Sequence, residues 1–166
     1  MIRPDFFERD SVIVAKDLLG NFLVRKTQGE TLRYKIIETE AYGDSKDLAS
    51  HARHGQTART KIMWDHPGTI YVYFTYGMHY MLNIVTGKKG IAGAVLIRGI
   101  EGCVGPGRLT KKLFIDKKLN GRLLGKKSGL WIEKGDDKRF KILTTPRIGI
   151  DYSGEWAKKL HRFVLQ

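Results

Sequence analysis

The amino-acid sequence predicts an α+β fold in which antiparallel hairpins form a sheet and a few helices pack around it. Three observations support this prediction: short runs with strand character recur along the chain, turn residues separate them, and few stretches have helical apolar spacing. The 166 residues contain no linker, repeat or low-complexity segment, so we expect one domain over residues 1–166.

The first predicted element is a helix over residues 9–20. Val14 and Leu18 have the four-residue spacing of a buried helical face. Asp10 or Ser11 can cap the N-terminus, and Gly20 is a typical stop signal.

Seven runs predict strands because apolar and polar residues alternate or because β-branched and aromatic residues dominate. They are residues 21–26, 32–41, 69–75, 79–85, 94–98, 131–133 and 147–150. Turn residues stand at 28–30, 66–68, 76–78 and 87–93. Polar residues 43–54 predict a loop with a short helix, and the glycine-rich residues 102–107 lead into a basic segment that is part helix and part loop.

The charge of the chain points to an anionic partner. There are 30 Lys and Arg residues against 17 Asp and Glu, a formal net charge of +13. Between Arg108 and Lys127, Asp116 is the only acidic residue in a basic run. A solvated face is the ordinary explanation of such a run, but the whole chain shares the bias. We therefore expect a nucleic-acid partner.

Cysteine use and hydropathy exclude several classes of protein. Cys103 is the only cysteine, which excludes an intramolecular disulfide and a CxxC metal or redox motif. This pattern is typical of an intracellular protein. No apolar stretch is long enough to span a bilayer, and the N-terminus lacks a signal-peptide core. We expect neither secretion nor membrane insertion.

Strand periodicity places polar and aromatic side chains on shared faces. The faces are Ile36, Glu38, Glu40 and Tyr42; Tyr71, Tyr73 and Thr75; His79, Met81, Asn83 and Val85; and Ala94, Leu96 and Arg98. The alternate residues of the last three runs are mostly apolar, as in a core. Solvent exposure is the commonest fate of such faces. The paired carboxylates Glu38 and Glu40 in so basic a chain favour a polar pocket instead.

Ordered motifs over nearly the whole chain resemble the alkyladenine (3-methyladenine) DNA glycosylases. They are residues 38–42 (Glu-Thr-Glu-Ala-Tyr), 49–52, 68–73, 76–78, 83–84, 94–98 and 147–150. The resemblance implies a curved antiparallel sheet in one domain. It also implies a monofunctional enzyme that flips a damaged purine out of duplex DNA and hydrolyses its N-glycosidic bond, with no metal, no cofactor and no covalent intermediate.

The same resemblance implies roles for individual residues. Glu40 corresponds to the general base that activates water, and Arg98 and the Ile150 carbonyl correspond to groups that hold this water. The implied base pocket is Tyr42, His51, Tyr73, Asn83 and Leu96, with Asn83 excluding the 2-amino group of guanine. Tyr76 and Met78 correspond to the DNA-intercalating residues, and Arg59, Arg108, Lys111 and Lys112 to phosphate contacts. Glu38 is expected to serve the structure, and Asp44 and Asp47 to belong to the loop before His51.

The implied substrates are 3-methyladenine, 7-methylguanine, hypoxanthine and ethenoadenine in double-stranded DNA. The implied product is an abasic site in base-excision repair, formed by a monomer in the bacterial cytoplasm and nucleoid or the eukaryotic nucleus. The chain departs from the family at Gly102–Cys103–Val104, where members usually have a longer segment. The shorter segment removes part of the surface that borders the DNA, so DNA affinity and substrate range do not follow from the resemblance. Met81 stands where a cysteine is frequent, and His79 stands at a variable position.

Three alternative functions agree less well with the sequence. A non-catalytic nucleic-acid-binding module would explain the charge and the tyrosines, but it gives no reason for Glu40 and His51. A zinc deaminase would need HxE and PCxxC motifs, which the chain lacks. A glycosylase with lyase activity would need an amine nucleophile. No lysine falls on the predicted pocket faces, although Lys35 and Lys61 lie close in sequence.

Overall fold

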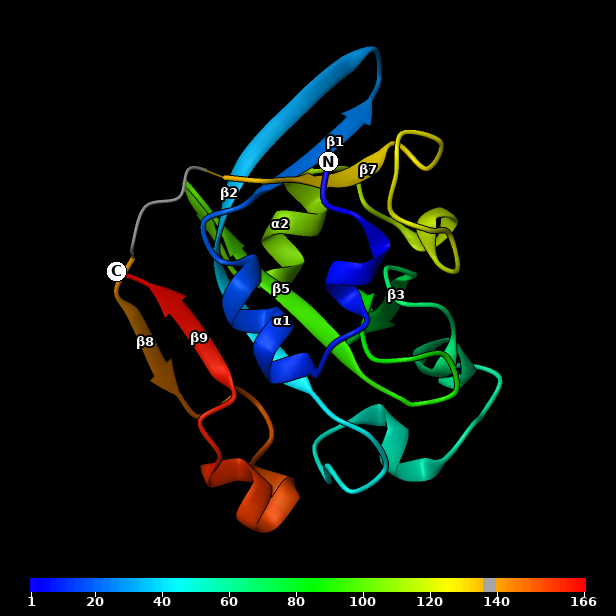
Figure 1. Ribbon diagram of the computed structural model, residues 1–166, viewed down its shortest axis with the longest axis vertical. Coiled ribbons are helices and arrows are strands. Elements are labelled where there is room, and N and C mark those ends of the chain that lie inside the picture. The colour runs from blue at the N-terminus through cyan, green and yellow to red at the C-terminus, as the bar shows by residue number, and fades with distance from the viewer. Residues whose placement is uncertain (136–139) are drawn as a thin grey trace.

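The predicted N-terminal helix is present as α1 (Ser11–Leu18) in the computed structural model, which describes residues 1–135 and 140–166 (Figure 1). Asp10 is its N-cap, because Oδ1 accepts a hydrogen bond from the backbone N–H of Val12 at 2.8 Å. Gly20 follows with a φ of +82°, a conformation that favours glycine.

The strands of the described residues form one sheet of nine strands in which every pairing is antiparallel. The order is β3-β4-β5-β2-β1-β7, with β6 beside β5 and the pair β8-β9 attached to β2. The bounds are β1 (Phe22–Thr27), β2 (Glu30–Tyr42), β3 (Ile70–Thr75), β4 (His79–Val85), β5 (Ala94–Ile100), β6 (Cys103–Val104), β7 (Leu130–Glu133), β8 (Ile142–Thr145) and β9 (Arg162–Leu165). This topology, with α1 beside the sheet, confirms the α+β fold class.

The remaining helical segments are short. The basic region contains α2 (Pro106–Lys112) and is otherwise mainly loop, as predicted. The 3₁₀ segments are η1 (Pro4–Phe7), η2 (His51–His54), η3 (Lys61–Trp64), η4 (Lys117–Leu119) and η5 (Asp151–Lys158). Among the residues that the structure describes, no helix combines the length and the apolar character needed to cross a membrane.

β2 is the central strand, and a bulge bends it. Its first half pairs with β1 and its second half with β5 and β9, with register shifts between Ile36 and Thr39. The prediction that Ile36 shares a face with Glu38 and Glu40 is wrong. Ile36 lies in the main hydrophobic core together with Ala41, because the irregular register reverses the alternation between them.

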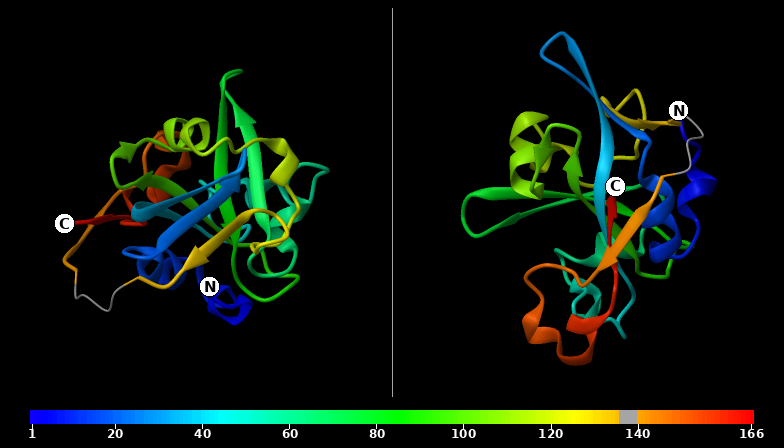
Figure 2. Two further views of the ribbon diagram at one scale, coloured as in Figure 1. Left: turned by 90° about the horizontal axis from the view of Figure 1, so that it is seen from above. Right: turned by 90° about the vertical axis from the view of Figure 1, so that its left-hand side faces the viewer.

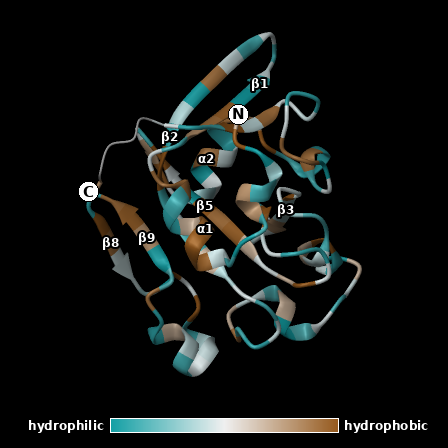
Figure 3. Cartoon of the chain, viewed as in Figure 1, coloured by the Kyte–Doolittle hydropathy of each residue, from teal (hydrophilic) through white to brown (hydrophobic). Residues whose placement is uncertain are grey.

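The main core confirms most of the predicted apolar faces of β3, β4 and β5. Its members from these strands are Ile70, Val72, Leu82, Ile84, Val95 and Ile97. Figure 3 shows the resulting hydrophobic character of β5, against which α1 packs. Phe74 is an exception, with 49% of its surface exposed; it lies near the tip of the β3–β4 hairpin, where its ring contacts that of Tyr80. Both views of Figure 2 show this hairpin projecting from the rest of the sheet.

The predicted strand over residues 147–150 is absent, and this prediction is wrong. Gly149 has a φ of +75°, which is incompatible with a strand, and the backbone N–H of Ile148 donates to a glutamate side chain. The late strands are instead β8 and β9, on either side of this turn and of η5 (Figure 1).

Candidate active site

A cavity of about 340 Å³ lies beside the bent end of β2. Its volume is within the range typical of small-molecule pockets. Side chains on the predicted polar faces of four strands line it: Tyr42, Tyr71, Tyr73, Thr75, Met81, Asn83, Ala94, Leu96 and Arg98. Residues from connecting segments complete the wall, among them His51, Arg59, Tyr76, Ile148, Ile150 and Tyr152. The structure therefore brings the predicted base-pocket residues together.

Glu40 is fully buried and contacts three residues that line this cavity. Oε1 accepts the backbone N–H of Ile148 at 2.8 Å, and Oε2 accepts the Tyr42 hydroxyl at 2.8 Å. Nε of Arg98 lies 3.5 Å from Oε1. Burial raises the pKa of Glu40, and the charge of Arg98 and the two hydrogen bonds oppose this effect.

Glu38 forms the stronger contact with Arg98. Its Oε1 accepts hydrogen bonds from Nε of Arg98 at 2.9 Å and from Nε of Arg162 at 2.6 Å. All three side chains are largely buried, and Arg162 is further held by Thr145, whose hydroxyl accepts from Nη1 at 3.0 Å. The carboxylates Glu38 and Glu40 and the two arginines thus form a charge-balanced cluster beside the cavity.

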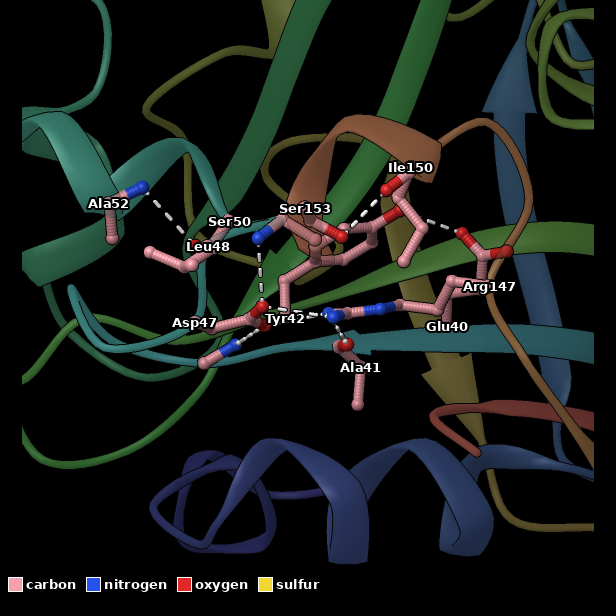
Figure 4. Close-up of polar contacts among 12 residues, drawn as sticks. Glu40, Ala41, Tyr42, Asp47, Leu48, Ser50, Ala52, Arg147, Ile150 and Ser153 are labelled. Atoms are coloured by element: carbon pink, nitrogen blue, oxygen red, sulfur yellow. Dashed lines mark hydrogen bonds and ion pairs between the residues drawn. The ribbon is translucent and has the colours of Figure 1, made fainter. Parts of the chain in front are cut away.

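A buried ion pair, Asp47–Arg147, joins the loop before His51 to the turn after β8 (Figure 4). Nη1 and Nη2 of Arg147 donate to the two carboxylate oxygens at 2.6 and 2.9 Å, and Nη1 also donates to the carbonyl of Ala41 at 2.8 Å. Burial alone would raise the pKa of Asp47, but the bonds from Arg147 and two backbone amides lower it. This pair was not predicted from the sequence, although an arginine within the apolar segment 147–150 is a signal of a buried charge that needs a partner.

Ile150 also belongs to this turn. Its carbonyl oxygen accepts two hydrogen bonds from Ser153, one from the backbone N–H at 2.9 Å and one from the hydroxyl at 2.6 Å. Ile150 lines the cavity, and its carbonyl oxygen is the group expected to accept a hydrogen bond from the water. The Ser153 hydroxyl already occupies one of the acceptor positions of this oxygen.

Aromatic rings form one wall of the cavity. The ring of His51 meets that of Tyr73 edge to face, with centroids 4.6 Å apart, and its Nδ1 shares a hydrogen bond with the Tyr71 hydroxyl at 3.0 Å. Burial, and the nearby positive charge of Arg59, lower the pKa of His51 to about 4. The imidazole is therefore neutral at physiological pH.

Two further predicted pocket residues lie opposite each other in the sheet. Asn83 of β4 is paired in register with Leu96 of β5, and both are almost fully buried. The amide nitrogen of Asn83 donates to the carbonyls of Tyr71 and Met81, each at 3.3 Å, which fixes the orientation of the amide.

The residues predicted to contact DNA are exposed. Tyr76 and Met78 stand at the tip of the β3–β4 hairpin, 80% and 67% exposed, and only Tyr76 lines the cavity. Arg59 borders the cavity, with its guanidinium carbon 5.2 Å from the centroid of the Tyr73 ring. The side chains Arg108, Lys111 and Lys112 lie on α2, whose first residue, Pro106, reaches the cavity wall.

Tyr71, Tyr152 and Ile148 line the cavity but were given no role from the sequence. Strand alternation had placed Tyr71 on the same polar face as Tyr73. Tyr152 and Ile148 depend on a turn that was predicted as a strand. Within residues 1–135 and 140–166, no group of three or more His, Cys, Asp or Glu side chains is placed to hold a metal ion.

Comparison with known proteins adds a family to this geometry. The model of the family described as methylpurine-DNA glycosylase (MPG) matches residues 5–104 and 101–166, two stretches that meet at the short segment around Gly102. A protein of Legionella pneumophila (strain Paris) described as a 3-methyladenine DNA glycosylase is 44% identical, covering 100% of this chain and 94% of the relative. Proteins with the same description from Anaeromyxobacter sp. (strain Fw109-5) and Clostridium perfringens are 42% and 41% identical, each covering 98% of this chain.

Proposed function

The chain belongs to the methylpurine-DNA glycosylase family, and on this premise we propose that it flips a damaged purine into the cavity and releases it with water activated by Glu40. It is a 3-methyladenine DNA glycosylase, a hydrolase of N-glycosyl bonds. The observation that carries the proposed mechanism is the buried carboxylate of Glu40, surrounded by residues that line a pocket of suitable size.

Selection of the lesion begins with stacking. Alkylation at N3 or N7 gives a purine a formal positive charge and weakens its glycosidic bond. The ring faces of Tyr42 and Tyr73 would favour such a cation by about 1–2 kcal/mol for each good contact. Because His51 is uncharged at neutral pH, it adds no repulsion and can form a hydrogen bond with the base edge. Asn83, held by two carbonyls, would exclude the 2-amino group of normal guanine.

In the proposed reaction, Glu40 accepts a proton from water as the water oxygen bonds to C1′ of the flipped nucleotide. The bond between C1′ and the purine nitrogen breaks, and its electron pair neutralises the cationic base. A negative carboxylate beside the sugar would also stabilise the oxocarbenium character of the transition state. Glu40 must be ionised for this role, and Arg98, Ile148 and Tyr42 favour the ionised form.

Arg98 and the Ile150 carbonyl are proposed to hold the water. For Ile150 this requires the Ser153 hydroxyl, which can rotate, to share or release the carbonyl oxygen. The proposed substrates are 3-methyladenine, 7-methylguanine, hypoxanthine and ethenoadenine. The neutral lesions among them need protonation of the leaving base.

The exposed residues support a duplex substrate. Flipping costs a few kcal/mol, least for a damaged or poorly paired base. Tyr76 at the hairpin tip would fill the gap left in the stack, with Met78 beside it. Arg59 and the basic side chains of α2 would contact phosphates, which position the duplex without reading its sequence. We propose that one chain acts as a single glycosylase domain and monomer.

The substitution Glu40→Gln tests this mechanism. It keeps the shape of the side chain but removes the proposed base, so base release from a duplex with one lesion should fall at least about a hundredfold while binding persists. Glu133→Gln is the matched control, because Glu133 is also paired with an arginine, Arg33, but lies away from the cavity. Release at the wild-type rate by Glu40→Gln would remove Glu40 as the base.

A further inference from the structure

Arg98 is shared unequally between two carboxylates. Its Nε lies 2.9 Å from Oε1 of Glu38 but 3.5 Å from Oε1 of Glu40. Glu38 is itself fixed by Arg162, whose Nε lies 2.6 Å from the same oxygen. The position of the Arg98 guanidinium is therefore set chiefly by Glu38, the carboxylate to which the mechanism assigns no chemical step.

The fold makes specific room for this contact. Glu38 lies at the register shift of β2, opposite Gly99 of β5. A Cβ atom at Gly99 would lie 3.0 Å from Cβ of Glu38 and 3.3 Å from its Oε2, so a larger residue would displace the Glu38 side chain. Glycine within a strand commonly marks such a close approach.

The contact through Nε leaves the terminal nitrogens of Arg98 available. These nitrogens form no hydrogen bond with the residues that the structure describes, and Arg98 lines the cavity. Without Glu38, attraction would draw the guanidinium toward Glu40, because arginine and carboxylate favour a bidentate pair. Such a pair would occupy the carboxylate that must receive a proton from water.

We propose that Glu38 is a positioning residue for base release, because it holds Arg98 through Nε. Arg98 then stabilises the Glu40 carboxylate without forming a bidentate pair with it. Its terminal N–H groups remain available to water in the cavity. This inference rests on the proposed role of Glu40 as the base. Glu38 acts only through Arg98, so the two side chains must be energetically coupled.

The charges around Glu40 set the expected pH effect. Burial raises the pKa of Glu40, and Arg98 of β5, the Ile148 backbone N–H, the Tyr42 hydroxyl and Arg147 of the turn oppose this effect. Glu40 in turn contributes to the raised pKa of Tyr73 of β3. Across the sheet, Arg162 of β9 is the register partner of Glu40. Removing the negative charge of Glu38 would leave Glu40 among more positive charge and nearer Arg98, which lowers its pKa. A carboxylate with a lower pKa is a weaker base.

The test is Glu38→Gln, measured in the wild type and in an Arg98→Gln background, with single-turnover release of 7-methylguanine from duplex DNA. In the wild type, release should slow roughly tenfold with duplex affinity unchanged, and the acidic limb of the pH–rate profile should move to lower pH. In the Arg98→Gln background the same substitution should slow release less than about twofold. Glu133→Gln should leave both the rate and the profile unchanged.

Equal fold losses in both backgrounds, or an unmoved acidic limb, would overturn the proposal and leave Glu38 a purely structural residue. Thermal unfolding checks that each variant is folded. If Glu38→Gln does not fold, Gly99→Ala, which crowds Glu38 without removing its charge, should show the same dependence on Arg98. The role of Glu40 as the general base is tested by a different result: it would fail if Glu40→Gln released the damaged base at the wild-type rate.

Discussion

The hydroxyl group of Tyr42 donates a hydrogen bond to Oε2 of Glu40 over 2.8 Å. Burial and the adjacent Glu40 carboxylate raise the pKa of Tyr42 well above its ordinary value, so the hydroxyl remains a donor. The ring of Tyr42 also lines the cavity. Tyr42, which is proposed to stack on the purine, is therefore hydrogen-bonded directly to Glu40, the proposed general base. Lesion binding and water activation thus depend on the same tyrosine side chain.

Tyr42→Phe separates these two roles. The ring that stacks is retained, but the ionised form of Glu40 loses a hydrogen bond, so the pKa of Glu40 rises further. The ionised form is the active one, and the acidic limb of the pH–rate profile should therefore move to higher pH, while lesion affinity changes little. Single-turnover rates across pH measure this shift. An unchanged limb would show that the hydrogen bond does not tune the base.

Asp47→Asn should destabilise the fold severely. It removes one partner of a buried bidentate ion pair and leaves the Arg147 charge uncompensated, which typically costs about 3–5 kcal/mol of unfolding free energy. Asp17→Asn is the matched control, because the Arg9–Asp17 pair is partly exposed and should contribute about 0–1 kcal/mol. Denaturant unfolding at neutral pH compares the two.

The same pair predicts a pH dependence of stability. The folded-state pKa of Asp47 is below that of an unfolded aspartate, about 3.9. Its stabilisation is thus fully present above the unfolded pKa and is lost as the pH falls through the folded pKa. The difference between wild type and Asp47→Asn should shrink over this acidic range. A constant difference down to the lowest pH would contradict the ion-pair explanation.

Tyr76→Ala should impair base flipping more than duplex binding. Tyr76 is exposed at the hairpin tip, so removing its ring takes away the proposed wedge, while the contacts of Glu40 with Tyr42 and Arg98 stay in place. Lesion-specific affinity and release should fall, while affinity for undamaged duplex changes little. A fluorescent base analogue placed next to the lesion in the duplex reports the flipped state. Equal losses of specific and non-specific binding would argue against a wedge.

Local sequence signals were sufficient where local interactions form the structure. A cap at Asp10 or Ser11, the turn at residues 28–30 and the β3–β4 hairpin were predicted because capping, turn chemistry and alternation act over a few neighbouring residues; the structure selects Asp10 as the cap. The family was also recognisable, because its motifs are short runs in a fixed order. The roles assigned to the site residues remain predictions that the proposed experiments test.

The fold class, the family and the polar faces of β3, β4 and β5 could all be predicted from residue patterns along the chain. The turn at residues 147–150, the bulge that buries Ile36 and the unequal sharing of Arg98 could not. In each case the deciding partner is remote: Ile148 bonds to a carboxylate 108 positions away, and β2 must satisfy β1, β5 and β9 along one strand. These hydrogen bonds and this burial depend on which segments come into contact in the folded chain. A pattern of neighbouring residues does not predict contacts between segments that are far apart in the sequence.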